Sequence, residues 1–500
     1  MKKTLLSLAA ISLLSMNLHA DEISDLKLQM QKMMEKIEKL EKKQAQVQTQ
    51  TSSSADVKVL TEKVKKLEKN QKRTKKTLAK VKAHDAFDNI KFGLDFRNTI
   101  ESLEYKDNIT GQEAHNHSLL TSRLYLTMAS SPMPGLTFKG KLAVYSTWGS
   151  HLYVDDAPLK SWSASSKPSD DVIRIKEAYF VYSNDIGDQP ISVSIGRRPS
   201  TNGFLANYRE NEPESGSPLA HITNMEVNGA MVRLDWDRFV TGAYTKFVYG
   251  RAHTGEMNNV YGTDSGGSSQ TPWGPYADKD TDLEDENVDF ALMLGDAYND
   301  GQYELMYQWA HIFDTKGKST TKFDSNGKPI VKGSAGVADL AALSFKVDGI
   351  GDEISDFLDE TTFFVSGAYT NYNSKSGHTL IGSSDGGSQD GHSIWAGVII
   401  PDMISDAGKL GFEYNHGSKY WTPMTWAEDT AIGSKVAVRG DAYEAYWNFD
   451  LFGVKYLPSQ VRYTYVQHDY TPNINCAGWV TPEKADIVAQ NIRFAVSYRY

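Results

Sequence analysis

Hydrophobic and polar residues alternate along most of the chain after residue 85. In the first clear example the apolar positions are Ile90, Phe92, Leu94 and Phe96, and the residues between them are Lys91, Gly93, Asp95 and Arg97. Successive side chains of a β-strand point to opposite faces of its sheet, so this pattern predicts a strand with one apolar and one polar face. In a membrane barrel the apolar face contacts lipid and the polar face lines the lumen.

The same alternation recurs along the chain. In one later segment the apolar residues that we expect to face lipid are Val288, Phe290, Leu292 and Leu294. The pattern predicts strands at 90–104, 118–130, 136–148, 172–182, 190–197, 227–236, 239–249, 287–295, 301–313, 337–347, 361–372, 393–400, 409–417, 436–450, 459–469 and 488–500. The even number suits a bacterial barrel. The predicted fold is all-β, a transmembrane antiparallel β-barrel of about sixteen strands over 84–500.

The connections between these segments alternate between short and long. Short connections include SSPMP, SNDIGDQ, DAYND and the pair Asp237 and Arg238, whereas the long ones, such as 149–171 and 198–226, are rich in Gly, Ser, Asp and Asn. Outer-membrane barrels alternate short periplasmic turns with long extracellular loops, and a soluble β-sandwich has no reason to do so. One short-side connection, 348–360, is longer, and we expect a short helix there.

The C-terminal segment NIRFAVSYRY, residues 491–500, ends on an aromatic residue. Its apolar positions include Phe494, Val496, Tyr498 and Tyr500. A last strand of this kind resembles the insertion signal of outer-membrane barrels. The alternative, an amphipathic edge strand of a soluble sheet, is disfavoured because an exposed edge invites aggregation.

Residues 1–20 have the three parts of a secretory signal. Lys2 and Lys3 form a basic start, an apolar stretch runs from Leu5 to Met16, and Ala20 stands at the expected cleavage point. The stretch is shorter than the roughly 20 apolar residues that a membrane-spanning helix needs, which disfavours an uncleaved anchor.

Between the signal and the alternating region, apolar residues recur at steps of three and four. The pattern forms two blocks, 23–47 and 57–81, which the polar segment TQTSSSA separates. The stripe positions are Ile23, Leu26, Met30, Met33, Ile37, Leu40, Gln44 and Val47, then Val57, Leu60, Val64, Leu67, Gln71, Thr74, Leu78 and Val81. This spacing is typical of an α-helical coiled coil, which we predict in the periplasm over 21–83. A solvated amphipathic helix that folds back on the barrel is the alternative.

Charge changes at the same boundary. Residues 21–83 carry 17 Lys or Arg against 9 Asp or Glu, a net charge of +8, whereas the whole chain has a net charge of −10. Two modules are therefore indicated. Such a basic helix is usually just solvated, but it could also touch anionic peptidoglycan or lipid headgroups. The single cysteine, Cys476, excludes an internal disulfide.

Three segments of the barrel region carry a family resemblance. They are RIKEAYFVY (174–182), IGRRPSTNGF (195–204) and YNHGSKYW (414–421). Together with the C-terminal strand and the coiled coil, they resemble outer-membrane porins with an N-terminal coiled coil, most closely a little-characterised porin-like family of epsilon-class proteobacteria. The resemblance covers nearly all of 85–500. It implies the fold and the cellular location more than any transported substrate.

The resemblance also implies a place for the pore constriction, because the third extracellular loop of porins folds inward. By strand count that loop is 198–226. We predict that the charged residues in it and at the preceding strand end form the constriction: Arg197, Arg198, Arg209, Glu210, Glu212 and Glu214. Opposed charges there would orient dipolar solutes and tune ion preference. A solvated surface loop is the alternative.

The polar positions of the predicted strands give the lumen lining. The predicted basic residues are Lys91, Arg97, Arg123, Lys139, Lys141, Arg233 and Arg499, and the acidic ones are Asp95, Glu101, Asp235, Asp289, Glu304 and Glu413. The lining leans basic and the loops lean acidic, so the sign of ion selectivity stays open.

Other chemistry has weak signals. The acidic loop 278–286 resembles part of a calcium loop but lacks its glycine and its terminal glutamate, so a solvated tip or a bridge through cations to lipopolysaccharide is favoured. The segment GHSIW (391–395) has Trp395 where a nucleophile elbow has glycine. We predict no metal site, no cofactor and no nucleic-acid partner.

The expected function is an outer-membrane porin that passes small hydrophilic solutes or ions by passive diffusion. We expect a homotrimer, formed through the barrel and the coiled coil, in outer-membrane lipid and lipopolysaccharide. Two alternatives stay open. One is a closed barrel that anchors the membrane to the cell wall through the coiled coil, and the other is a hydrolase at the barrel rim that uses Ser393 and His392.

Overall fold

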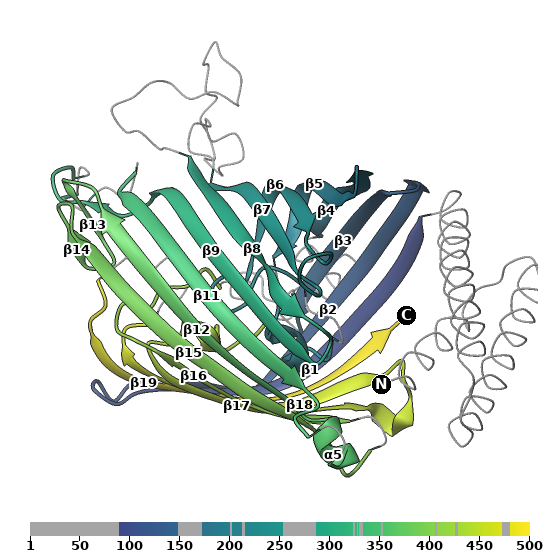
Figure 1. Ribbon diagram of the computed structural model, residues 1–500. Coiled ribbons are helices and arrows are strands. Elements are labelled where there is room, and N and C mark those ends of the chain that lie inside the picture. Colours follow the sequence, from purple (N-terminus) through teal and green to yellow (C-terminus); the bar gives the residue numbers. More distant parts are fainter. Residues whose placement is uncertain are drawn as a thin grey trace, which may run out of the picture. The chain divides into compact units, whose positions relative to one another are not determined.

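The computed structural model describes residues 90–148, 173–200, 203–212, 216–253, 287–323, 326–327, 329, 334–351, 354–405, 408–425, 429–472 and 481–500. In this part of the chain, sixteen strands form one closed antiparallel barrel (Figure 1). The predicted fold class of the barrel is therefore confirmed. The predicted signal at 1–20, the coiled coil at 21–83 and the acidic loop 278–286 lie outside the described residues.

Each barrel strand pairs with its neighbours along the chain, and the first strand pairs with the last. The barrel strands are β1 (Lys91–Asp107), β2 (Glu113–Met133), β3 (Leu136–Thr147), β4 (Arg174–Ile186), β5 (Gln189–Ser200), β6 (Met225–Asp235), β7 (Tyr244–His253), β8 (Val288–Asn299), β9 (Tyr303–Thr315), β11 (Gly336–Asp348), β12 (Thr362–Ser374), β15 (Ser388–Pro401), β16 (Lys409–Gly417), β17 (Gly440–Asp450), β18 (Pro458–Tyr470) and β19 (Lys484–Arg499). Closure leaves no strand edge unpaired, which is what a β-structure in lipid requires.

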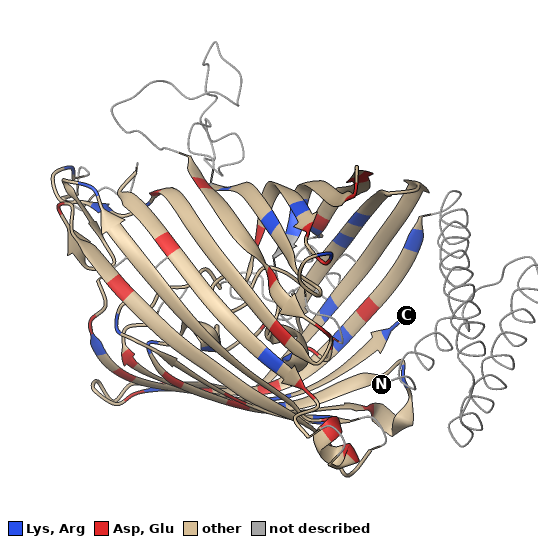
Figure 2. Cartoon of the chain, viewed as in Figure 1, with Lys and Arg blue, Asp and Glu red and all other residues tan. Residues whose placement is uncertain are grey.

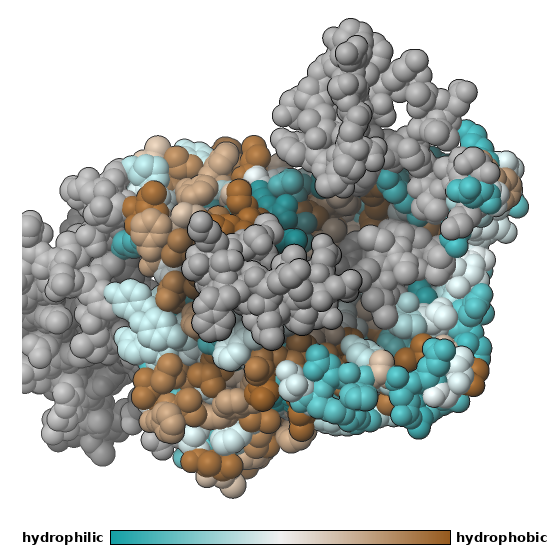
Figure 3. All heavy atoms as spheres, turned by 180° about the vertical axis from the view of Figure 1, so that it is seen from behind, coloured by the Kyte–Doolittle hydropathy of each residue, from teal (hydrophilic) through white to brown (hydrophobic). Residues whose placement is uncertain are grey.

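The contact between β1 and β19 closes the barrel. Phe96 lies opposite Tyr498, and Ile100 lies opposite Phe494. These four side chains are 38–49% exposed, because they project outward from the wall. Hydrophobic residues gather on the outer surface elsewhere too, as Figure 3 shows from behind. The two-residue alternation thus places apolar side chains outside over most of the wall.

Strand β8 is an exception, and here the sequence prediction was wrong. Phe290, Leu292 and Leu294 are at most 8% exposed and belong to a hydrophobic core inside the barrel. The predicted lipid-facing set, which also includes Val288, therefore faces inward. Apart from Asp289, the other face of this strand is also apolar, with Ala291 and Met293, so the alternation of residues alone could not show which face is the inner one.

Several boundaries also differ from the prediction. Strand β7 begins at Tyr244 rather than at 239, because residues 236–243 form a longer turn. The backbone N–H of Trp236 donates to the carbonyl oxygen of Ala243, and the N–H of Ala243 donates to that of Val240. Strand β17 begins at Gly440, after the 3-10 helix η3 (Lys435–Ala437). The helix expected in 348–360 is present as α5 (Asp356–Asp359). A small sheet of β10 (Lys318–Ser319), β13 (His378–Leu380) and β14 (Ser383–Ser384) was not predicted.

Two loops lie inside the barrel. The β5–β6 loop (described residues 203–212 and 216–224) contains the short helix α4 (Ala206–Arg209), and the β16–β17 loop (418–425 and 429–439) contains η3. Their apolar side chains pack on the inner faces of β8, β9, β11, β12 and β15. Met424 accepts a backbone hydrogen bond from Asn224 and donates one to Ile222, which joins the two loops. Among the described residues, no helix combines the length and hydropathy needed to cross a membrane.

Candidate functional site

The β5–β6 loop crosses the barrel to the far wall. Asn448 on β17 donates a hydrogen bond of 3.2 Å to the carbonyl oxygen of Tyr208, and Gln460 on β18 donates one of 2.5 Å to that of Arg209. At its near end the loop is held by β9, where Gln308 accepts a hydrogen bond from the backbone of Leu219. Gly203 is required there, since a Cβ atom would lie 1.7 Å from the carbonyl oxygen of Pro218. The loop is thus fixed at both ends.

The crossing places helix α4 in a cluster of opposed charges. Glu210 accepts a hydrogen bond of 2.9 Å from Arg209 and lies 3.7 Å from Arg462 on β18. Burial raises the pKa of Glu210, but the attraction of Arg209 and Arg462 outweighs it and lowers the pKa to about 2. Glu210 is therefore charged at neutral pH.

The same cluster continues onto the neighbouring strands and the second loop. Lys435 lies between Glu413, at 2.6 Å, and Glu444, with which it forms a second ion pair. All three side chains are at most 4% exposed. Arg209 lies 3.8 Å from Glu444 and so links the two groups of charges. We call Arg209, Glu210, Glu413, Lys435, Glu444 and Arg462 the α4 charge cluster.

A second cluster surrounds Asp429 of the β16–β17 loop. Its carboxylate is 2.9 Å from Arg97 and 2.5 Å from Arg123, and its backbone oxygen accepts a hydrogen bond from Arg493. These arginines come from β1, β2 and β19, and all three are less than 9% exposed. Burial raises the pKa of Asp429, but the arginines hold it well below its ordinary value. The loop itself is anchored by Arg439, which donates to the carbonyl oxygens of Trp421 and Thr471.

Two open spaces lie on either side of the Asp429 cluster. One, of about 510 Å³, lies toward the loop end of β1–β4 and is lined by Arg97, Arg123, Lys176, Glu226, Asp429 and Arg493 among others. The other is a narrow neck of about 30 Å³ toward the opposite end, lined by Arg97, Glu210, Gln460, Arg493, Ser497 and Arg499 among others. They share Arg97 and Arg493, so these two side chains stand between the two spaces.

The structure separates the residues predicted to form the constriction. Arg209 and Glu210 are in the α4 charge cluster. Arg197 instead pairs with Glu226 at 3.1 Å, and Arg198 lies over the ring of Tyr179 at 5.2 Å. Glu212 follows helix α4, and its carbonyl oxygen accepts a hydrogen bond from Asn207; Glu214 lies outside the described residues.

Many of the residues predicted to line the lumen have their contacts on the inner side of the wall. Inward-facing examples include Lys141, which pairs with Glu177, and Arg499, which pairs with Asp95 at 3.1 Å. Figure 2 shows charged residues of both signs along the strands. Asp289 was wrongly placed, because it lies on the outer face with Arg251 at 2.7 Å. The cause is the inverted alternation of β8, whose apolar set faces inward.

Sequence reasoning missed several charged residues of the two clusters. Glu444, Arg462 and Arg493 occupy polar positions of strands that were predicted, so the same alternation could have found them. Asp429 and Lys435 lie in a loop, where no periodicity marks an inward side chain.

Ser393, named for the rim hydrolase, lies in the wall beside a histidine other than the expected His392. The ring of His221 is 2.9 Å from Ser393 through Nε2 and 2.8 Å from Ser366 through Nδ1. His221 is fully buried and Ser393 is 6% exposed. In a catalytic triad a carboxylate would stand where Ser366 stands here. The hydrogen bonds that His221 makes with Ser366 and Ser393 tie the β5–β6 loop to the wall. The described residues contain no group of three His, Cys, Asp or Glu arranged to hold a metal ion.

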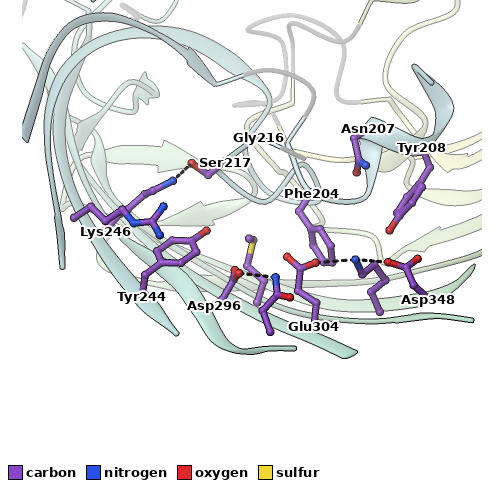
Figure 4. A pocket seen from close by; sticks show the side chains of 14 residues that line it. Phe204, Asn207, Tyr208, Gly216, Ser217, Tyr244, Lys246, Asp296, Glu304 and Asp348 are labelled. Carbon is purple, nitrogen blue, oxygen red and sulfur yellow. Dashed lines mark hydrogen bonds and ion pairs between the residues drawn. The ribbon is translucent and has the colours of Figure 1, made fainter. Parts of the chain in front are cut away.

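A third space, of about 470 Å³, lies beneath the β5–β6 loop on the side of β6–β11 (Figure 4). It shares no lining residue with the two spaces beside the Asp429 cluster.

Comparison with known proteins gives one family match. The family model described as "Protein of unknown function (DUF3373)" matches residues 113–496. No curated protein matches the sequence.

Several solved structures show some similarity to this chain. Pseudomonas putida OprB is 12% identical with a TM-score of 0.45, over 84% of this chain and 96% of that one. The anion-selective porin of Comamonas acidovorans is 11% identical with a TM-score of 0.45, over 82% and 99%. Vibrio cholerae OmpT, an outer membrane protein, is 12% identical with a TM-score of 0.43, over 82% and 97%.

Proposed function

Because this chain belongs to the DUF3373 family of proteins of unknown function, we propose a role from its geometry: an outer-membrane channel through which small hydrophilic solutes or ions diffuse passively. The observation that carries this proposal is the pair of spaces on either side of Arg97 and Arg493. A route along the β19–β1–β2 wall would pass these arginines, Asp429 and Glu210. Charges of both signs at a narrow point discriminate among ions and orient dipolar solutes.

The location in the outer membrane is supported by the wall. The sheet is closed into a barrel, and large apolar side chains such as Phe92 and Ile195 are more than half exposed on its outer surface. Lipid would cover these side chains, and no backbone group of the wall would lack a partner. A secretory signal at 1–20 and the C-terminal residues Phe494, Val496, Tyr498 and Tyr500 as insertion signal fit the same location.

The constriction that we propose differs from the one the sequence predicted. It consists of Arg97, Glu210, Asp429 and Arg493. The two arginines come from wall strands, Glu210 comes from the β5–β6 loop, and Asp429 comes from the β16–β17 loop. Arg197 and Arg198 stand instead in the wall with their own partners, Glu226 and Tyr179.

A closed barrel that serves as an anchor is the second candidate. It is favoured by the hydrophobic core that fills the lumen beside β8–β15, which is unusual for an open channel. In that case the predicted coiled coil at 21–83 would link the barrel to peptidoglycan. For either function we propose a homotrimer in lipid and lipopolysaccharide, held by the barrel and the coiled coil.

Planar-bilayer recording of the refolded chain distinguishes the open channel from the closed anchor. We expect stable conductance steps, with a reversal potential in a salt gradient that gives the ion preference. A correctly inserted but electrically silent barrel would refute the channel and favour the anchor. As a second test of the route, Arg493→Met should change the conductance, whereas Arg251→Met on the outer face should leave it unchanged.

A further inference from the structure

We propose that the space beneath the β5–β6 loop binds a small zwitterion, a solute that carries one carboxylate and one ammonium group, such as a free amino acid. Its volume of about 470 Å³ is within the range of small-molecule sites. The loop covers it with Phe204, Tyr208 and Ser217, and the wall supplies charged side chains (Figure 4). The proposal rests on the channel only for the route by which a solute arrives.

One side of this space is cationic. The guanidinium of Arg233 lies 4.0 Å and the ammonium of Lys246 lies 4.9 Å from the ring centre of Tyr244. Arg233 has an ion-pair partner, Asp235, at 2.5 Å. Lys246 donates to the hydroxyl of Ser217 at 2.8 Å, and among the described residues no carboxylate forms an ion pair with it. An ammonium has three donors, so Lys246 can bind a further anionic group.

The other side is anionic. Asp296 is only 5% exposed, and one of its oxygens accepts a hydrogen bond of 3.1 Å from Asn299. Its second oxygen, Oδ1, has no hydrogen-bond partner among the described residues, and no cation there forms an ion pair with it. Glu304 differs, because it shares Lys346 with Asp348 at 3.0 and 2.6 Å. A buried carboxylate without such a partner is unfavourable, and an ammonium group from a ligand would compensate it.

Lys246 and Asp296 attract each other, and Tyr244 lies close to Asp296, but neither charge forms an ion pair with a described residue; these two charges define the ligand. Figure 4 shows Lys246 and Asp296 to either side of Tyr244, both at the same space. A simple anion would satisfy Lys246 alone, and a simple cation would satisfy Asp296 alone. A zwitterion satisfies both and leaves the net charge of the space unchanged. Phe204 and Met306, which also line the space, offer apolar contact to the rest of the solute.

Isothermal titration of the complete chain, refolded in detergent, tests this inference with L-alanine and its two single-charge analogues, propionate and ethylamine. We expect alanine to bind at least about tenfold more tightly than either analogue, because hydrogen bonds to charged groups contribute the most. Asp296→Asn and Lys246→Met should each weaken alanine binding by about tenfold or more. Matched controls are Asp289→Asn on the outer face of β8 and Lys139→Met, which lines none of the three spaces; both should bind alanine like the unaltered chain.

Three results would overturn the inference: equal binding of alanine and an analogue, unchanged binding in both site variants, or equal loss in the controls. The test is separate from that of the channel. A conducting barrel that does not bind alanine keeps the channel and refutes the zwitterion site. A silent barrel that binds alanine with the expected variant effects does the reverse.

Discussion

The side-chain amide of Gln460 lies 2.5 Å from the carbonyl oxygen of Arg209, a residue 251 positions earlier in the chain. This hydrogen bond joins helix α4 of the β5–β6 loop to strand β18, which is far from β5 around the barrel. Asn448 on β17 adds bonds to the same helix. The position of Glu210 at the neck therefore depends on these two amides.

Loss of both amides should release α4 from the wall. In the double variant Asn448→Ala and Gln460→Ala, three hydrogen bonds to α4 of about 1 kcal/mol each are lost, so the displaced form should gain roughly 160-fold in population. We expect a larger and noisier conductance and faster proteolysis within 203–224. Val461→Ala, on the outer face of β18, is the control. Unaltered conductance and proteolysis in the double variant would contradict the anchoring role.

Asp429 should set the ion preference. Asp429→Asn removes one negative charge from beside Arg97, Arg123 and Arg493, so the passage becomes more positive. We expect the anion-to-cation permeability ratio to rise by roughly three- to tenfold, as a local change of about 1 kcal/mol implies. The reversal potential in a salt gradient measures it. Glu360→Gln, a 61% exposed acid near Lys409, is the control. A shift toward cations, or none, would contradict this position of Asp429 in the passage.

Lys435 should matter for stability more than for selectivity. Lys435→Met leaves Glu413 and Glu444 buried without their shared cation, and breaking such a group typically costs about 3–5 kcal/mol. Urea unfolding of the barrel in detergent measures the loss. Lys419→Met in the same loop should change the free energy of unfolding little, and adding Glu444→Gln should restore part of it. A loss under about 1 kcal/mol would show that the cluster is not structurally important.

The strand pattern made the barrel predictable from the sequence. Strand β16 has the predicted bounds, and most others agree within a few residues, because each alternates between lipid and lumen. The pattern failed at β8, where a hydrophobic core inside the barrel makes both faces apolar. Long-range packing of the β5–β6 loop determines that face, and no local signal in Phe290 or Leu292 shows it.

The candidate site was predictable only in part. Arg97 and Glu210 were named, the first from alternation and the second from the position of its loop. Asp429 was not predicted, because it becomes part of the site only through contacts with three arginines on strands β1, β2 and β19. These arginines are up to 332 residues away along the chain. A loop residue acquires such partners only when the barrel closes.

Acidification should loosen the β5–β6 loop through His221. Burial lowers the pKa of His221 from an ordinary value of 6.5 to about 3, so the neutral ring is the folded form. As the pH falls, this histidine therefore takes up a proton in the unfolded chain before it does so in the folded chain. The stability that depends on the neutral ring is fully present above pH 6.5. It is lost as the pH falls toward 3, by up to about 1.4 kcal/mol per pH unit. Glu210, with a pKa lowered from 4.5 to about 2, adds a loss only below pH 4.5.

Between pH 6.5 and 4.5 Glu210 contributes no loss, so the dependence comes from histidines, and the partly buried ring of His468 on β18 contributes to it beside His221. In that window the free energy of unfolding of the refolded barrel should fall with pH, and His221→Gln should reduce the slope to the part that His468 contributes, while lowering stability at pH 7. His392→Gln, an exposed histidine next to Ser393, should keep the full pH dependence. If His221→Gln retains the slope of the unaltered chain, the hydrogen bonds that His221 shares with Ser366 and Ser393 do not hold the loop, and its attachment must rest on the apolar contacts of Leu219 and Ile222.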